Sequence, residues 1–225
     1  MTIRAALLAL SLAAPAAPAT ADPVVVELFT SQGCSACPPA DAMLAGLAGR
    51  DDVIALAFHV DYWDWIGWTD TFGDAAHSER QRRYAAAADT TIVYTPQFVI
   101  GGHDAIAGPK GMDLMGAIEA HQGATPDLLR ADGAGFAVAD GAGGRLTLLF
   151  VQPEAEVAIG QGENGGRVMR YHRIVRAMRD LGAWDGRAGR MDLPPPPEGL
   201  RRVVLAQAEG EDGGLGRVLG AVALD

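Results

Sequence analysis

The residues best suited to chemistry are the two cysteines of the chain, which stand three positions apart in Cys34-Ser35-Ala36-Cys37. Two cysteines at this spacing on the first turn of a helix can close a small disulfide ring. The first sulfur would lie near unpaired backbone N–H groups and the positive end of the helix dipole, which favour the thiolate needed for thiol–disulfide exchange. We therefore expect Cys34 to be the nucleophile and Cys37 to be the resolving thiol that releases the partner.

The cysteines lie between a predicted strand and a predicted helix. Residues 24–29 are β-branched and almost wholly apolar, as in a strand covered on both faces. Apolar residues then recur at helical spacing over 40–47, after two prolines that suit a first helical turn. A second buried strand over 53–60 would pair parallel to the first through a right-handed crossover. Helices are also expected at 74–88 and 112–121, and hairpin strands at 97–100 and 104–107, which makes the order β-α-β-α-β-β-α.

The second half of the chain has a different pattern. From about residue 134, short strand candidates without helical crossovers are separated by Gly, Asp or Pro clusters. This spacing favours a small antiparallel β sandwich or barrel-like domain. The segment 170–181 fits a strand or a helical stripe, and we favour the strand. The strand candidates are 134–139, 145–151, 155–160, 168–176, 201–208 and 215–223, and the expected divisions of the chain are 1–21, 22–123 and 134–225.

An aromatic cluster follows the second predicted strand. His59 lies near the end of that strand, and Tyr62, Trp63, Trp65 and Trp68 come shortly after it. Because the carboxyl ends of parallel strands share one edge of a sheet, this cluster would lie beside the cysteines. The rings would either line a peptide or apolar-ligand groove, or pack the first half against the β-rich half. Three roles are open for His59: structural residue, metal ligand or proton carrier.

The N-terminal residues match a secretory signal peptide. Arg4 gives a basic start, residues 5–14 form an apolar run too short to span a bilayer, and small residues precede the expected cleavage site after Ala21. Ala19 ends a second candidate site. We expect export to the periplasm, where disulfides persist. No later stretch reaches about 18 apolar residues, so no membrane span is expected.

The composition restricts the partners. The 225-residue chain is 49% apolar and 20% charged, with a formal net charge of −10, which is typical of a globular protein. Stable nucleic-acid binding needs basic patches that displace counterions, so this class is excluded. Two cysteines also exclude a four-cysteine zinc site. The expected partner is a periplasmic protein or a small thiol or disulfide, no cofactor is expected, and the oligomeric state stays open.

Residues 24–122 resemble the thioredoxin superfamily. The resemblance rests on the order of the elements, on the cysteine pair after the first strand, and on Thr95-Pro96 just before the third. It implies an α/β thioredoxin-like fold, a cis bond at Pro96 beside the redox pair, and a Thr95 backbone that is presented to a bound peptide. A narrower resemblance, to a family of exported proteobacterial thioredoxin-like proteins of unknown function, also covers the β-rich second half. Its motifs are residues 27–41, 59–64 and 95–97.

One acidic residue departs from the thioredoxin pattern. Thioredoxins place a buried acid six residues before the first cysteine, where this sequence has Leu28, with Glu27 next to it. In a regular strand, a one-residue offset turns a side chain to the opposite face. Glu27 is therefore either a proton-transfer residue that reaches the sulfurs through a strand bulge, or a buried acid paired with an arginine.

Three functions follow from these residues. The first is a thiol–disulfide oxidoreductase, whose substrate groove would be formed by Tyr62, Trp63, Trp65, Thr95 and Pro96. The second is a copper-binding module that uses Cys34, Cys37 and His59, because soft sulfur suits Cu(I). The third is an adaptor in which the disulfide is structural and takes part in no exchange.

Overall fold

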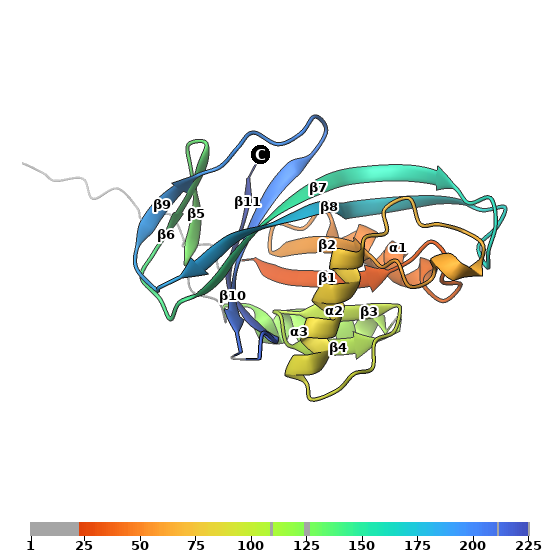
Figure 1. Ribbon diagram of the computed structural model, residues 1–225, viewed down its shortest axis with the longest axis horizontal. Helices are drawn as coiled ribbons and strands as arrows, with labels where there is room; N and C mark the ends of the chain where they lie inside the picture. The colour runs from red at the N-terminus through yellow and green to blue at the C-terminus, as the bar shows by residue number, and fades with distance from the viewer. Residues whose placement is uncertain (1–22, 109, 124–126, 211, 225) are drawn as a thin grey trace, which may run out of the picture.

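The computed structural model describes residues 23–108, 110–123, 127–210 and 212–224. The elements in chain order are β1 (Val24–Thr30), α1 (Pro38–Leu47), β2 (Val53–His59), η1 (Asp64–Ile66), α2 (Ala75–Ala87), β3 (Gln97–Ile100), β4 (Asp104–Ala107), α3 (Gly111–His121), β5 (Leu129–Asp132), β6 (Gly135–Val138), β7 (Gly144–Ala158), β8 (Val168–Trp184), β9 (Gly189–Asp192), β10 (Arg201–Glu209) and β11 (Leu215–Leu224). Eight strands form one mixed sheet in the order β11-β10-β7-β8-β2-β1-β3-β4, and β5, β6 and β9 form a second sheet (Figure 1). The predicted signal peptide, residues 1–21, lies outside the described ranges, within which no helix is long and apolar enough to cross a membrane.

Strand β1 is buried along its whole length because helices cover both faces of the sheet around it. Val24, Val26 and Leu28 share a core with residues of α1 and α3. Val25 and Phe29 share the core on the other face, which includes a residue of α2. This alternation follows from the two-residue period of a strand. The prediction of a strand covered on both faces is therefore confirmed.

The pairing of β1 brings two loops to one end of the sheet. β1 pairs parallel with β2, and the two strands end together with Thr30 opposite His59. On its other side β1 pairs antiparallel with β3, which turns back into β4. The order of elements over residues 24–121 is the predicted one. The cysteine segment after β1 and the aromatic segment after β2 therefore start from the same edge.

The β-rich second half differs from the separate antiparallel domain that the sequence suggested. Its long strands extend the central sheet, because β8 pairs with β2 at Ala57 and Ile174. This pairing covers what would otherwise be the open edge of β2. Among the described strands, β5, β6 and β9 alone form a separate layer, and Phe136 of this layer shares a core with Leu148 and Val204. The sequence pattern changes near residues 123–134, but strands from both sides of this point belong to the same eight-stranded sheet.

A long hairpin links the second half to the cysteine end of the sheet. β7 and β8 are 15 and 17 residues long and pair along most of their length. The strand candidates 145–151 and 155–160 are thus one strand, and the preference for a strand at 170–181 is confirmed. In Figure 1 this hairpin runs along the sheet beside β2 and extends past the point where β1 and β2 stop. Its tip is therefore available to build a site with loops of the first half.

Candidate functional site

Cys34 and Cys37 form a disulfide in the turn that joins β1 to α1. The Cys34 N–H donates to the Ser31 carbonyl at 3.1 Å, and Cys37 occupies the N-cap position of α1. The two cysteines are 1% and 0% exposed, although Ser35 and Ala36 between them are exposed. The disulfide is therefore closed to a molecule in solvent unless the surrounding loops move.

The start of α1 offers fewer free N–H groups than the sequence suggested. Pro38 and Pro39 have no N–H, and the next two N–H groups, of Ala40 and Asp41, both donate to the Cys37 carbonyl. The helix begins at Pro38, so the first cysteine precedes its first turn. The expectation that both cysteines lie on the first turn of the helix is therefore wrong. The helix dipole remains as a source of thiolate stabilisation.

The loop after β2 and the residues before β3 meet beside the cysteine turn. Trp63 Nε1 donates to Thr95 Oγ1 at 2.8 Å, and the Thr95–Pro96 bond is cis, which confirms the expectation. Trp63 also lies against Gly33, where an added Cβ would come within 3.2 Å of the Trp63 Cβ. Because Gly33 immediately precedes Cys34, this tryptophan connects the cysteine turn to the segment around Pro96.

The other aromatic residues of the cluster lie in different environments. The Tyr62 hydroxyl donates to Gln81 Oε1 at 3.0 Å, which ties it to α2. Trp65 is 81% exposed. Trp68 packs against the tip of the β7–β8 hairpin and donates to Gln32 Oε1 at 2.8 Å. Trp68 therefore packs the first half against the second half, whereas the ring of Trp65 is open to solvent.

The tip of the β7–β8 hairpin covers the cysteine turn. Asn164 is buried, and its Nδ2 donates to the carbonyls of Gln32 and Cys34 at 3.0 and 2.9 Å. Glu163 accepts a hydrogen bond from the Ser35 N–H at 3.1 Å. Sequence reasoning missed both residues, because they follow the cysteine turn by about 130 positions in a segment typical of a glycine-rich turn. The second half therefore contributes directly to the site.

A buried carboxyl group lies one helical turn after Cys37. Asp41 Oδ1 accepts a hydrogen bond from the Thr30 hydroxyl at 2.7 Å, and Asp41 Oδ2 has no hydrogen-bond partner among the described residues. Burial raises the pKa of Asp41 to about 6, although His59 and Thr30 act to lower it. Asp41 stands four positions after Cys37, the N-cap residue of α1, and residues at this spacing lie on one side of a helix. The sequence did not single it out, because an acid in a first helical turn is common.

His59 adds a second buried polar group on the α1 side of the sheet. Its Nδ1 lies 2.8 Å from Asp70 Oδ2, and its Nε2 has no partner among the described residues. Burial acts to raise the pKa of Asp70, but the charge and hydrogen bond of His59 outweigh it, together with hydrogen bonds from the Gln32 and Phe72 N–H groups, so this pKa is lowered. Unpartnered atoms of Asp41 and His59 therefore lie within the same buried region.

Glu27 has the second role that the sequence left open, as a buried acid paired with an arginine. Its carboxylate accepts hydrogen bonds from Arg80 at 2.7 and 2.6 Å and from the Tyr84 hydroxyl at 2.6 Å. β1 keeps a regular register with both neighbours, so Glu27 lies on the face covered by α2, whereas α1 covers the other face. Glu27 therefore faces away from α1, and the prediction that it transfers protons to the sulfurs through a strand bulge is wrong.

The copper-site alternative applies only to a reduced form of the protein, because the two sulfurs are bonded to each other. Among the described residues, a different group has the side chains and spacing of a metal site, with donor atoms within 4.8 Å of one another. It consists of His103, Asp104 and His121.

These features define the class of the protein, a mixed α/β chain with a disulfide-bonded Cys-x-x-Cys segment between its first strand and first helix. The family model described as "Protein of unknown function (DUF1223)" matches residues 25–207, and the chain belongs to this family. No curated protein matches the chain.

Two solved structures are similar to this one. An X-ray crystal structure of a protein from Agrobacterium tumefaciens has 30% sequence identity and a TM-score of 0.78, and the match covers 89% of this chain and 93% of that chain. HBP35 of Porphyromonas gingivalis has 16% identity and a TM-score of 0.53, and the match covers 91% of this chain and 75% of that chain. The second likeness concerns the fold alone.

Proposed function

We propose that this chain is an exported thiol–disulfide oxidoreductase with a thioredoxin-like first half, which exchanges its Cys34–Cys37 disulfide with a protein or a small thiol partner. The observation that carries the proposal is the disulfide itself, which lies after a buried strand and before a helix that supplies a buried acid one turn later. The Trp63–Thr95 hydrogen bond holds the segment before β3 beside this turn, where a partner backbone would bind.

The exchange has two steps in which atoms and electrons balance. In the oxidised form, a partner thiolate attacks Cys34 Sγ, the bond to Cys37 breaks, and Cys37 Sγ leaves as a thiolate that takes up a proton. A second partner thiolate then attacks the mixed disulfide and displaces Cys34 Sγ, which is protonated in turn. The partner dithiol thus becomes a disulfide and the cysteine pair becomes two thiols. The reverse sequence reduces a partner disulfide, with the Cys34 thiolate as nucleophile.

Asp41 is the group that exchanges the proton of Cys37. Its pKa of about 6 is close to neutral pH, where a group can both donate and accept a proton efficiently. The Asp41→Asn variant keeps an oxygen that can accept from Thr30 but removes the titrating group. We expect the wild-type exchange rate to change with pH near 6 and this change to vanish in the variant. Identical pH profiles for the two proteins would rule out this role of Asp41.

A partner reaches the sulfurs from the side of the exposed Ser35 and Ala36. Both sulfurs are buried, and the hydrogen bonds of Asn164 hold the carbonyls on either side of the turn. Exchange therefore requires the hairpin tip to move. Trp65, which is exposed on the loop after β2, offers an aromatic ring to the incoming partner.

Trapping of a mixed disulfide tests the roles of the two cysteines. The Cys37→Ser variant, incubated with oxidised glutathione and measured by intact mass, should retain glutathione on Cys34, because attack remains while the resolving thiol is gone. The matched Cys34→Ser variant should retain far less. Equal retention by both variants, or by neither, would overturn the assignment.

Equilibration with a thiol buffer separates the oxidoreductase from the adaptor. The folded wild-type protein, placed in mixtures of reduced and oxidised glutathione, should reach an equilibrium between dithiol and disulfide that depends on the buffer ratio. A disulfide that stays intact in reducing mixtures while the protein remains folded would favour the adaptor with a structural disulfide. Quantification of both forms after acid quenching distinguishes the two outcomes.

A further inference from the structure

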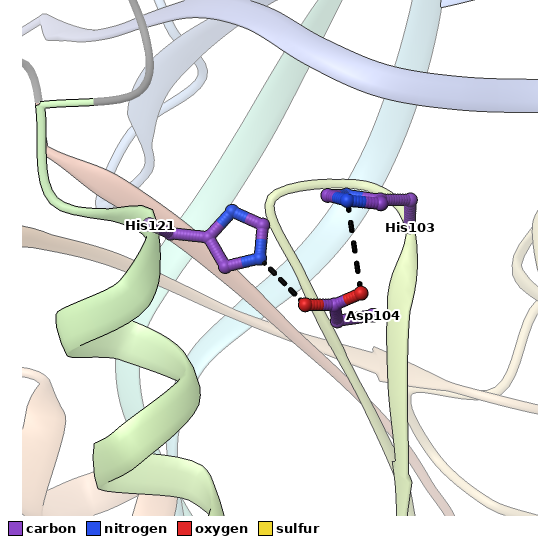
Figure 2. Close-up of side chains that lie close together, drawn as sticks. All are labelled: His103, Asp104 and His121. Atoms are coloured by element: carbon purple, nitrogen blue, oxygen red, sulfur yellow. Dashed lines mark hydrogen bonds and ion pairs between the residues drawn. The ribbon is translucent and has the colours of Figure 1, made fainter.

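The turn between β3 and β4 and the last residue of α3 bring three metal-ligand side chains together. His121 Nε2 lies 2.9 Å from Asp104 Oδ2, and His103 Nε2 lies 3.6 Å from Asp104 Oδ1. The two imidazole rings are 5.0 Å apart, at an angle of 74°. Figure 2 shows that both rings direct a nitrogen toward the same carboxylate, from two different elements of the fold.

The spacing of these atoms is close to that of a zinc site. Bonds of about 2.0–2.2 Å to nitrogen and oxygen place two ligands of a tetrahedral zinc ion roughly 3.4 Å apart. The distances of 2.9 and 3.6 Å, which run from the two imidazoles to the two different oxygens of the Asp104 carboxylate, lie on either side of this value. One donor atom from each of the three residues lies within 4.8 Å of the other two. The His103 side chain is 45% exposed, so a small rotation of its ring toward the other two ligands completes the set.

The fold holds His121 more firmly than His103. The His121 side chain is 10% exposed, and its ring lies over Gly101 in the β3–β4 turn. A Cβ at position 101 would come within 2.4 Å of His121 Nδ1, and Gly101 has a φ of +58°, a conformation in which L side chains are strained. Glycine at position 101 therefore leaves the space that the His121 ring occupies. His121 is thus held in place while His103 can move, and this combination suits a site that binds and releases its ion.

We propose that His103, Asp104 and His121 form a binding site for a divalent transition-metal ion of the zinc class. Two imidazoles and one carboxylate match the ligands that Zn²⁺ takes, and they differ from the oxygen ligands preferred by Mg²⁺ or Ca²⁺. Three protein ligands leave a fourth position of the ion open to water or to a donor group of a partner molecule. His103 and Asp104 are about half exposed, so this open position faces solvent.

This site is separate from the cysteine pair. In the antiparallel pairing of β1 with β3, Gln97 lies beside Phe29 near the cysteine end, whereas Ile100 lies beside Val26 near the start of β1. The turn that contains His103 follows Ile100. The metal site and the disulfide therefore lie toward opposite ends of β1, and the failure of one proposal leaves the other intact.

Zinc binding by the disulfide-intact full-length chain tests the proposal. The protein carries no polyhistidine tag, is treated with chelator, and is titrated with ZnCl₂ in a calorimeter, with MgCl₂ as a second titrant. We expect one zinc per chain and no binding of magnesium. The oxidised cysteines supply no thiolate, so the ion has to use other ligands. Absence of saturable zinc binding would overturn the site.

Single variants then locate the ion. Loss of an outer partner of a metal ligand alone weakens metal binding roughly 10- to 100-fold, so we expect His103→Ala and His121→Ala each to weaken zinc binding by at least about tenfold. The matched control is His172→Ala, since His172 also lies beside an acid, at 4.0 Å from Glu154, but belongs to no group of three possible ligands within the part of the chain that the structure describes. Zinc affinity that is unchanged in both site variants, or lost in the control, would overturn the assignment.

A variant that preserves the shape of the site shows whether a loss of zinc binding comes from the missing ligand or from misfolding. Asp104→Asn removes the negative charge and keeps the side-chain volume at an exposed position, so the protein should fold as before while zinc affinity falls. The wild-type complex with Co²⁺ in place of zinc should show the visible absorption of a four-coordinate ion. Loss of this absorption in a folded Asp104→Asn protein supports the site, and its persistence contradicts it.

Discussion

Two His–Asp pairs lie in this molecule with nearly the same geometry and opposite surroundings. His59 Nδ1 lies 2.8 Å from Asp70 Oδ2 in a region closed to solvent. His121 Nε2 lies 2.9 Å from Asp104 Oδ2, and the Asp104 side chain is 52% exposed. The buried pair is surrounded by Phe72 and Tyr171, whose rings stack edge-on against His59. The comparison shows that distance alone does not define what a pair can do. Burial fixes the first pair in place, whereas exposure lets the second accept an ion.

This difference in burial has a large effect on the stability that is lost when one residue of a pair is removed. Removing a buried carboxylate leaves its hydrogen-bond donors without an acceptor and without water, whereas water readily replaces a lost partner at the surface. In addition, Asp70 accepts hydrogen bonds from the Gln32 and Phe72 N–H groups, so it also fixes the loop before the cysteines. Four substitutions test this contrast between buried and exposed groups.

The largest effect is expected from Asp70→Ala. The substitution leaves His59 and the N–H groups of Gln32 and Phe72 without their acceptor in a buried region. We expect the free energy of unfolding to fall by about 3–5 kcal/mol. Denaturant unfolding followed by tryptophan fluorescence measures this change. A loss below 1 kcal/mol would mean that the buried pair behaves like a surface pair, and the contrast would fail.

Substitution of the neighbouring Asp41 should instead raise the free energy of unfolding at neutral pH. Its folded pKa is raised from 3.8 to about 6, so the folded state binds more protons than the unfolded state between these values. Stability from this group is therefore complete below about pH 4 and is lost as the pH rises to about 6. Asp41→Asn should remove this loss and raise the free energy of unfolding by up to about 3 kcal/mol at pH 7. The difference between variant and wild type, measured from pH 4 to pH 7, should grow with pH, and a constant difference would contradict the prediction.

The third effect tests the cover over the cysteine turn. Asn164→Ala leaves the carbonyls of Gln32 and Cys34 without their donor, so we expect a loss of about 1–2 kcal/mol in stability. The disulfide should also react faster with dithiothreitol, because the hairpin tip is held less firmly. The matched control is Glu163→Gln, which changes the neighbouring contact at an exposed position and should alter both quantities little. Equal reduction rates in Asn164→Ala and wild type would show that the tip does not limit access.

The smallest effect is expected from Asp104→Asn in the absence of metal. Exposed charged pairs contribute about 0–1 kcal/mol, and salt screens them further. The free energy of unfolding should therefore change by less than 1 kcal/mol, and less at high salt than at low salt. Thermal unfolding in chelator at two salt concentrations measures this change. A loss comparable to that of Asp70→Ala would show that the exposed turn supports the fold rather than a ligand.

The sequence predicts best where local pattern and burial agree. The apolar runs of β1 and β2 and the helical spacing of α1 are local signals, and they position the cysteine pair correctly. The one-residue offset of Glu27 from Leu28 also indicated correctly that the acid could face away, as its pairing with Arg80 shows. These inferences need only the period of a strand and the chemistry of the residue.

The remaining parts of the site depend on contacts between distant segments. Asn164 reaches Cys34 only because β8 pairs with β2 and directs the hairpin tip over the turn, and no local pattern encodes that pairing. Asp41 has the sequence of an ordinary first-turn acid, and its raised pKa depends on burial against His59. His121 joins His103 and Asp104 only after α3 packs back on the sheet. Tertiary packing determines each of these features.

The distance along the chain between the cysteines and Asn164 also sets an order of events in time. A chain is synthesised from its N-terminus, and folding units form as they emerge. Cys34 and Cys37 are therefore made before the segment that contains Asn164. Until β7 and β8 are complete, no hairpin tip can cover the cysteine turn. The growing chain thus passes through a stage in which this turn is uncovered, and the finished protein regains that state only when the hairpin lifts.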